Sequence, residues 1–128
     1  GKWFDKMSGR IYDINDVTPD VDHIVSLKHG HEAGLKCASR ELRTKFANDK
    51  RHLWAVHPTA NRRKGSRVTT FLMANQGYCK EYYGAVAIMY SDYGLKPSRG
   101  DRKAFYKYKQ LCLKHSKGML LDRKWWEF

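Results

Sequence analysis

Apolar residues follow two different spacings along the chain, one typical of strands and one typical of helices. Short runs at 3–13, 21–27 and 52–56 are rich in aromatic and β-branched residues, and we interpret them as a hairpin and two strands. Apolar side chains recur every three or four positions over 76–93, and a similar pattern covers 99–116. These spacings predict an α+β protein whose C-terminal part is helical.

Proline, glycine and serine positions predict where several elements begin and end. Pro19 lies in a loop, and Ser39 suits the N-cap of a short surface helix over 39–49. After the second strand, Pro58 suits the first turn of a short helix and Gly65 suits its end. The predicted order after the hairpin is therefore strand, long connection, strand and helix.

The length of 128 residues is enough for one domain with one hydrophobic core. We expect a single domain over 1–128, with its core at about 21–67 and a helical part at about 76–116. The tail, 117–128, is aromatic and basic. Its tryptophans either pack against the body of the protein or stack on nucleic-acid bases.

The charge is strongly positive and unevenly distributed. The formal net charge is +12, from 25 Lys and Arg against 13 Asp and Glu, which favours a polyanionic partner, with nucleic acid first. Five aspartates lie within 1–22, whereas ten basic residues lie within 96–124. An acidic cluster beside a basic surface can hold a cation while phosphates are attracted. A generic solubilising surface is the alternative, and the longest apolar run, 85–89, is too short for a membrane partner.

One set of polar residues is suited to phosphodiester hydrolysis. Asp22 and His23 are adjacent in the first strand, and Asn61 lies in the helix after the second strand. Carboxylate and amide oxygens are ligands for a hard divalent cation, and a neutral imidazole can take a proton from water. His52 opens the second strand, nine positions before Asn61. The alternative is that Asp22 and His23 form a buried, hydrogen-bonded pair.

Longer motifs surround these residues. "DVDHIVSLKHGHEAG" is followed by "FANDKRHLWAVHPTANRRKGS", and the flanks read "GKWFDKMSGRIYD" and "YCKEYYGAVAIMYSDYGL". Together they resemble the HNH endonuclease superfamily, or ββα-metal nucleases, in particular the small branch with D-H-I-V-P-L and N-R-S-K-G motifs. The resemblance covers about 1–95, with weaker similarity to about residue 112. It implies a ββα-metal core with an N-terminal hairpin and additional C-terminal helices.

The resemblance also implies a role for each matched residue. His23 matches the general base that activates the attacking water, and Asp22 matches a metal-binding carboxylate. Asn61 matches the residue that binds or orients the metal. His52 stands where most members have an Asn that braces the loop and the catalytic histidine, so it is grouped with the catalytic residues. An imidazole can brace by hydrogen bonding or can bind the metal, and both alternatives stay open.

A basic run follows Asn61 directly. We expect phosphate contacts from four of its residues, and a solvated charge run is the alternative. These residues are Arg62, Arg63, Lys64 and Arg67.

The cysteines are informative about the cellular compartment of the protein. Cys79 and Cys112 fall near positions that are cysteines in some secreted relatives, so the resemblance makes a disulfide between them a hypothesis. That similarity and the start at Gly1 instead of Met favour a secreted or periplasmic protein over a cytoplasmic or phage-encoded one. The odd cysteine, Cys37, argues against export.

The expected function is a metal-dependent endonuclease with low sequence specificity that prefers DNA. The resemblance implies 5′-phosphate and 3′-hydroxyl products and one divalent metal. Ligand types favour Mg²⁺ or Mn²⁺, whereas a metal-binding His52 would admit Zn²⁺ or Ni²⁺. Two alternatives are a nucleic-acid-binding module whose nuclease site has decayed and a toxin or phage nuclease that needs a partner. The sequence does not indicate the oligomeric state.

Overall fold

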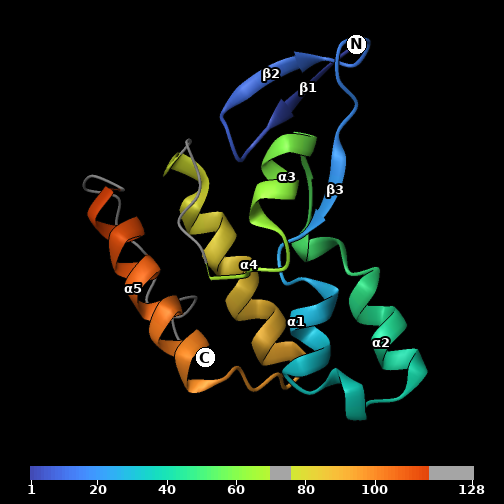
Figure 1. Ribbon diagram of the computed structural model, residues 1–128, viewed down its shortest axis with the longest axis vertical. Helices are drawn as coiled ribbons and strands as arrows, with labels where there is room; N and C mark the ends of the chain where they lie inside the picture. Colours follow the sequence, from blue (N-terminus) through green and yellow to red (C-terminus); the bar gives the residue numbers. More distant parts are fainter. Residues whose placement is uncertain (70–75, 116–128) are drawn as a thin grey trace.

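The computed structural model describes residues 1–69 and 76–115 (Figure 1). The protein is an α+β protein, and its described residues form two small antiparallel sheets, each made of two strands. Figure 1 shows the first sheet at one end of the molecule and the helices grouped below it. The tail, 117–128, and the two alternatives for its tryptophans lie outside the described residues.

The N-terminal hairpin has the predicted position. Strands β1 (Lys2–Asp5) and β2 (Arg10–Asp13) pair antiparallel. The buried Asp5 carboxylate closes the turn, because it accepts hydrogen bonds from the Met7 backbone N–H and the Ser8 hydroxyl. Because both of its carboxylate oxygens accept hydrogen bonds, Asp5 can be fully buried.

The second sheet and the helix after it also follow the predicted order. Strand β3 (Asp20–His23) pairs antiparallel with β4 (Leu53–Val56), and α3 (Pro58–Lys64) follows. Pro58 occupies the first turn of α3. Gly65 ends the helix with φ at 59°, a conformation that favours glycine.

The predicted strand over 21–27 is too long. It ends at His23, and a short helix, α1 (Leu27–Glu32), begins four residues later. Ser26 caps this helix, because its hydroxyl accepts a hydrogen bond from the His29 backbone N–H. A short apolar run does not distinguish a strand from the approach to a helix, so spacing alone missed the change.

The connection between β3 and β4 consists mainly of short helices and 3₁₀ turns. Ser39 caps the predicted surface helix, because its side chain accepts a hydrogen bond from a backbone N–H of the first turn. His52 ends a 3₁₀ turn instead of opening the second strand, which corrects the sequence prediction. The elements after α1 are η1 (Leu35–Cys37), α2 (Arg40–Ala47) and η2 (Lys50–His52).

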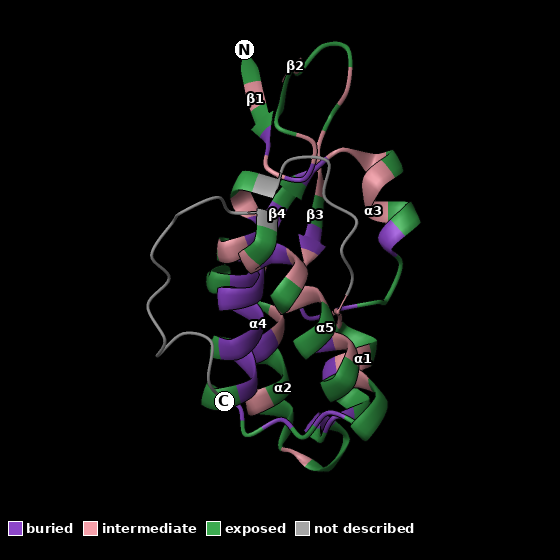
Figure 2. Ribbon diagram, turned by 90° about the vertical axis from the view of Figure 1, so that its left-hand side faces the viewer, coloured by how far each residue is buried: buried purple, intermediate pink, exposed green. Residues whose placement is uncertain are grey.

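The C-terminal part is helical, as predicted. A 3₁₀ turn, η3 (Gln76–Tyr78), leads into α4 (Cys79–Asp92), and α5 (Arg99–His115) follows. Figure 2 shows α4 as the most buried helix, and Figure 1 shows it between α5 and the helices α1 and α3. No helix in the described part of the chain is long and apolar enough to cross a membrane. The predicted inward face of α4 is buried and includes Tyr82, Val86 and Met89.

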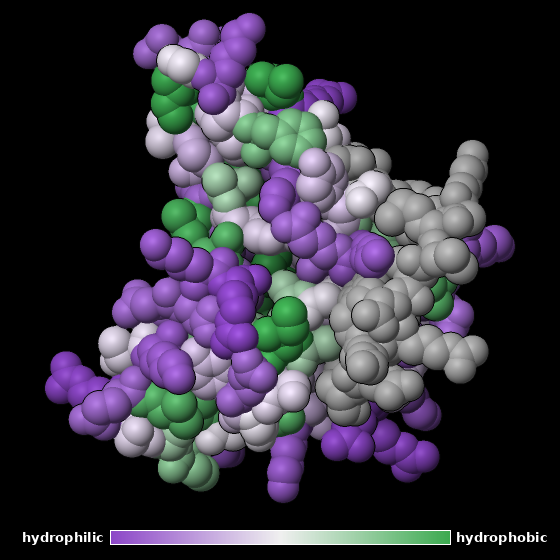
Figure 3. Space-filling model, turned by 180° about the vertical axis from the view of Figure 1, so that it is seen from behind, coloured by the Kyte–Doolittle hydropathy of each residue, from purple (hydrophilic) through white to green (hydrophobic). Residues whose placement is uncertain are grey.

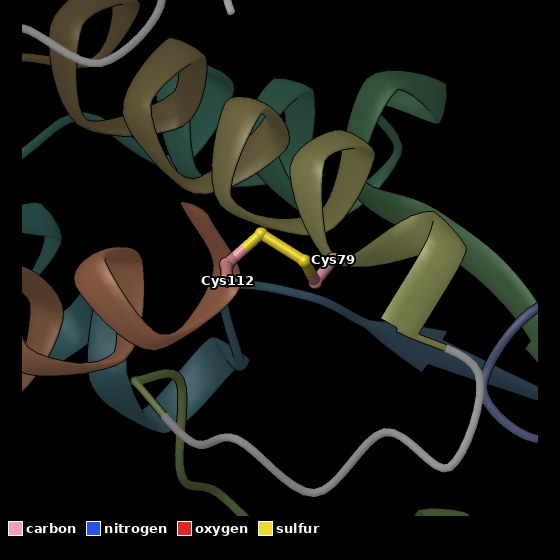
Figure 4. Close-up of a disulfide and its surroundings, with 2 residues drawn as sticks. All are labelled: Cys79 and Cys112. Atoms are coloured by element: carbon pink, nitrogen blue, oxygen red, sulfur yellow. A yellow bond between two sulfur atoms is a disulfide. The ribbon is translucent and has the colours of Figure 1, made fainter. Parts of the chain in front are cut away.

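A disulfide joins the two C-terminal helices. Cys79, at the start of α4, is bonded to Cys112 of α5, which is the pairing that the resemblance implied (Figure 4). Both cysteines belong to the core cluster, and Phe105 of α5 packs in the same cluster. Cys37 is a free, exposed cysteine. The disulfide thus fixes α5 against α4.

Candidate functional site

Side chains of β3 are divided between the two sides of the strand. Asp20 and Asp22 point towards α3, where they contact Asn61 and Lys64. His23 points the other way and contacts the end of α2. Asp22 and His23 are adjacent in sequence, but they lie in different environments, because successive strand residues face opposite directions.

His23 is half-buried and held at one nitrogen. Its Nε2 lies 2.9 Å from the carbonyl oxygen of Ala47, the last residue of α2. A ring nitrogen that faces a carbonyl carries the hydrogen, so this contact selects the Nε2–H tautomer and leaves Nδ1 as an acceptor. The geometry is that of an imidazole oriented to receive a proton.

His52 is fully buried beside His23. Its Nε2 lies 2.8 Å from the carbonyl oxygen of Phe46, and its ring centroid is 5.4 Å from that of His23. Its backbone carbonyl accepts a hydrogen bond from Ile24, directly after β3. Burial lowers the pKa of His52, which favours the neutral ring. With Nε2 held by the Phe46 carbonyl, His52 braces the end of α2, and its Nδ1 is buried without a hydrogen-bond partner among the described residues.

Lys64 forms a buried ion pair with Asp22. Its Nζ lies 3.0 Å from Asp22 Oδ1 and donates to the backbone carbonyls of His23, at 3.0 Å, and Ile24, at 3.2 Å. Burial raises the pKa of Asp22 and lowers that of Lys64, and the charge of each partner opposes that shift. Only 1% of Lys64 is exposed, so the expectation that it contacts phosphate is corrected.

Asn61 meets a different aspartate from the one predicted. Its Nδ2 donates to Asp20 Oδ2 at 3.2 Å, whereas Asp22 is held by Lys64. Asp20 was missed as a site residue. The two-residue spacing between Asp20 and Asp22 could have indicated it, since alternate strand residues share a face.

Oxygen donors dominate the region around Asn61. Among residues 1–69 and 76–115, Asp22 Oδ2 is buried and has no hydrogen-bond partner. Asp20 and Asn61 add a carboxylate and an amide oxygen nearby, and such donors suit Mg²⁺ or Mn²⁺ better than Zn²⁺ or Ni²⁺. In the same part of the chain, no group of three His, Cys, Asp or Glu side chains could hold a metal ion.

The three arginines of the basic run are exposed around α3. Arg67 Nε donates to the Lys64 backbone carbonyl at 3.2 Å, which fixes this arginine at the end of the helix. Arg62 and Arg63 extend from the helix itself. Figure 3 shows that the described surface on the rear face is mostly hydrophilic, with small hydrophobic patches between the polar groups.

Comparison of the chain with protein-family models, with curated proteins and with solved structures finds no match. Around β3, His23 and His52 lie on one side of the strand, and Asp20, Asp22 and Asn61 lie on the other.

Proposed function

We propose that the chain is a metal-dependent endonuclease of the ββα-metal type that hydrolyses phosphodiester bonds in nucleic acid, preferably DNA. One observation carries the proposal: His23 ends β3 with Nε2 fixed 2.9 Å from the Ala47 carbonyl, and Asn61 lies on the helix that follows the partner strand. The 5′-phosphate and 3′-hydroxyl products are those that the resemblance implies.

Proton transfer is assigned to His23. Its Nδ1 takes a proton from the attacking water, because Nε2–H is committed to a backbone carbonyl. This mechanism requires the substrate phosphate to lie across the end of β3, where it meets both His23 and the ligands on the other side of the strand. His52 donates a hydrogen bond to the carbonyl of Phe46, the residue before Ala47, and so keeps the end of α2 that orients His23 in place. His52 is a positioning residue in this mechanism.

Asp20 and Asn61, with Asp22 through Oδ2, would hold one Mg²⁺ or Mn²⁺ ion. The bound ion supplies positive charge that stabilises the developing charge on the phosphate and on the leaving oxygen. The carboxylates and the amide are hard oxygen donors, so the set matches such an ion in chemical type. Asp22 is aligned by Lys64, which donates to its other oxygen.

Substrate binding is mainly electrostatic. Arg62, Arg63 and Arg67 are exposed around α3, and the net charge of +12 attracts phosphates at long range. Backbone contacts of this kind carry no base information, so low sequence specificity is expected. Activity should fall steeply with added salt.

The test is cleavage of supercoiled plasmid with Mg²⁺ or Mn²⁺, measured by gel electrophoresis. Wild type should nick the plasmid, and His23→Ala should be at least about 100-fold slower, because general-base catalysis is lost. His31→Ala is the matched control, since His31 is exposed on α1, and it should stay within about twofold. Equal rates for wild type and His23→Ala would exclude His23 as the base.

A nucleic-acid-binding module without catalysis is the second candidate. The Lys64–Asp22 ion pair favours it, because an ammonium group occupies one oxygen of the proposed ligand. This candidate predicts salt-dependent DNA binding in EDTA and no nicking with any divalent ion. Binding without cleavage would establish it in place of the nuclease.

A further inference from the structure

A groove separates the N-terminal hairpin from α3. Figure 1 shows the hairpin next to α3, and the groove between them has a volume of about 360 Å³. This volume is within the range of about 300–1,000 Å³ that is common for small-ligand sites. The groove is lined by Asp5, Ser8, Arg10, Tyr12, His57, Thr59, Ala60 and Arg63.

The two long walls of the groove are positively charged. Arg10 extends from β2 and Arg63 from α3, and both are exposed. Neither guanidinium forms an ion pair with another of the described residues. The one acidic lining residue, Asp5, is fully buried and uses both carboxylate oxygens within the hairpin turn. The groove therefore offers two unpaired cations to an anion, with the planar geometry that suits phosphate.

An aromatic ring, that of Tyr12, lines the same groove as the two arginines. The Tyr12 ring lies 5.3 Å from the Trp3 ring and 5.0 Å from the His57 ring, measured between centroids. Trp3 is itself fixed, because its Nε1 donates to the Val17 carbonyl at 2.9 Å. Tyr12 is thus a half-buried ring held on two sides. Such a ring binds a nucleobase or sugar with little loss of side-chain entropy.

His57 adds a directional donor. Its Nδ1 accepts a hydrogen bond from the Thr59 backbone N–H at 3.1 Å, so the hydrogen of the neutral ring is on Nε2. The ring contacts Tyr12 and lines the groove. A hydrogen-bond donor beside two guanidinium groups and an aromatic ring is a combination that recognises a nucleotide.

We propose that this groove binds one unpaired nucleotide of the substrate strand, with its phosphate between Arg10 and Arg63 and its base or sugar against Tyr12. The inference rests on the proposed function and specifies a substrate strand that is unpaired at the site, as in a single strand or in a locally opened part of a supercoiled plasmid. A groove of about 360 Å³ admits one nucleotide and not a base pair with both backbones. The groove and the proposed metal ligand Asn61 share helix α3, although Asn61 faces Asp20 of β3 and does not line the groove.

The experiment measures binding of a fluorescein-labelled oligothymidylate by anisotropy in EDTA, where no cleavage occurs. Tyr12→Leu should weaken binding about 10-fold, since loss of one stacked base commonly weakens binding about 5- to 150-fold. Arg10→Ala should also weaken binding about 10-fold, because its contact with the phosphate is lost. The matched control is Arg102→Ala, an exposed arginine of α5, which should change affinity by about twofold or less. The same variants should change binding of a blunt duplex by about as little as the control does.

The outcomes separate the groove from the nuclease. Unchanged oligothymidylate binding by Arg10→Ala and Tyr12→Leu would overturn the proposal, as would equal weakening for duplex and single strand. Arg10 is exposed, so Arg10→Ala tests the groove even where Tyr12→Leu disturbs the hairpin. Weakened binding by the groove variants, together with a wild type that never cleaves, would support the groove and reject the nuclease. Plasmid cleavage with no effect of the groove variants on binding would reject the groove alone.

Discussion

Lys64 Nζ and Asp22 Oδ1 lie 3.0 Å apart in a region where Lys64 is 1% exposed and Asp22 is 4% exposed. The three hydrogens of the ammonium group have three acceptors, because the carbonyls of His23 and Ile24 accept the other two. The pair joins the last helical residue of α3 to the end of β3, and so fixes the backbone from which His23 extends.

Replacing Lys64 with Met should destabilise the protein strongly. The change leaves the Asp22 carboxylate and two carbonyls buried without their donor, and breaking a buried pair in this way commonly costs about 3–5 kcal/mol. Urea unfolding measures the loss. Lys103→Met, at an exposed position of α5, is the control and should stay within about 0.5 kcal/mol of wild type.

The double variant Asp22→Asn with Lys64→Met shows how much of the lost stability comes from an unpaired buried charge and how much from altered packing. If the ion pair is the source of the loss, the double variant loses less than the sum of the two single variants, because no unpaired charge stays buried. A Lys64→Met variant as stable as Lys103→Met would contradict the structure of this region.

Substitutions of Asp20 and Asp22 should differ in their effect on the stability of the fold. Asp20→Asn and Asn61→Ala should each weaken Mn²⁺ binding by at least about 10-fold in isothermal titration calorimetry, because each removes or alters a proposed ligand. Asp22→Asn should weaken Mn²⁺ binding as well, since it alters a proposed ligand, and should in addition lower stability in urea unfolding, since it breaks the pair with Lys64. Asp16→Asn, an exposed acid of the same segment, is the control. Equal effects of Asp16→Asn and Asp20→Asn on Mn²⁺ affinity would rule out a specific site.

Local signals in the sequence predicted much of the fold. Ser39, Pro58 and Gly65 act through their own φ angles or through hydrogen bonds to nearby backbone, so their effects are visible within a few residues. The missed helix α1 depends on a distant contact as well. A Cβ added at Gly30 would lie 2.8 Å from the Phe46 ring, so glycine at this position lets Phe46 of α2 pack closely against α1.

The site was predictable only in part. The motifs indicated His23, His52 and Asn61, but the partner of each polar group depends on contacts that no local pattern records. Lys64 lies 42 residues from Asp22, and basic charge in a surface helix normally predicts exposure. Alternation along β3 could have added Asp20, because it requires only the strand period.

Reduction of the disulfide between Cys79 and Cys112 should lower stability by about 4 kcal/mol, from the loop entropy of a 33-residue separation. Alkylation of the unfolded protein, followed by mass spectrometry, should label one cysteine before reduction and three after it. Cys37→Ser is the control for loss of a thiol, since Cys37 is exposed, and should change stability by less than about 0.5 kcal/mol. Three labelled cysteines without reductant would show that the bond is absent.

His52 should make the fold sensitive to acid. Burial lowers its pKa below the ordinary 6.5, so from pH 6.5 down to the folded-state pKa the unfolded chain binds more protons. The free energy of unfolding therefore falls as pH falls through this window, by at most about 1.4 kcal/mol for each pH unit. His52→Asn keeps a donor for the Phe46 carbonyl but cannot be protonated there, so its urea unfolding should change less between pH 7.5 and 5.5. His31→Gln, at an exposed position, is the control and should keep the wild-type pH dependence. The same acid sensitivity in wild type and His52→Asn would exclude His52 as its source, and loss of nicking by His52→Asn would contradict its bracing role.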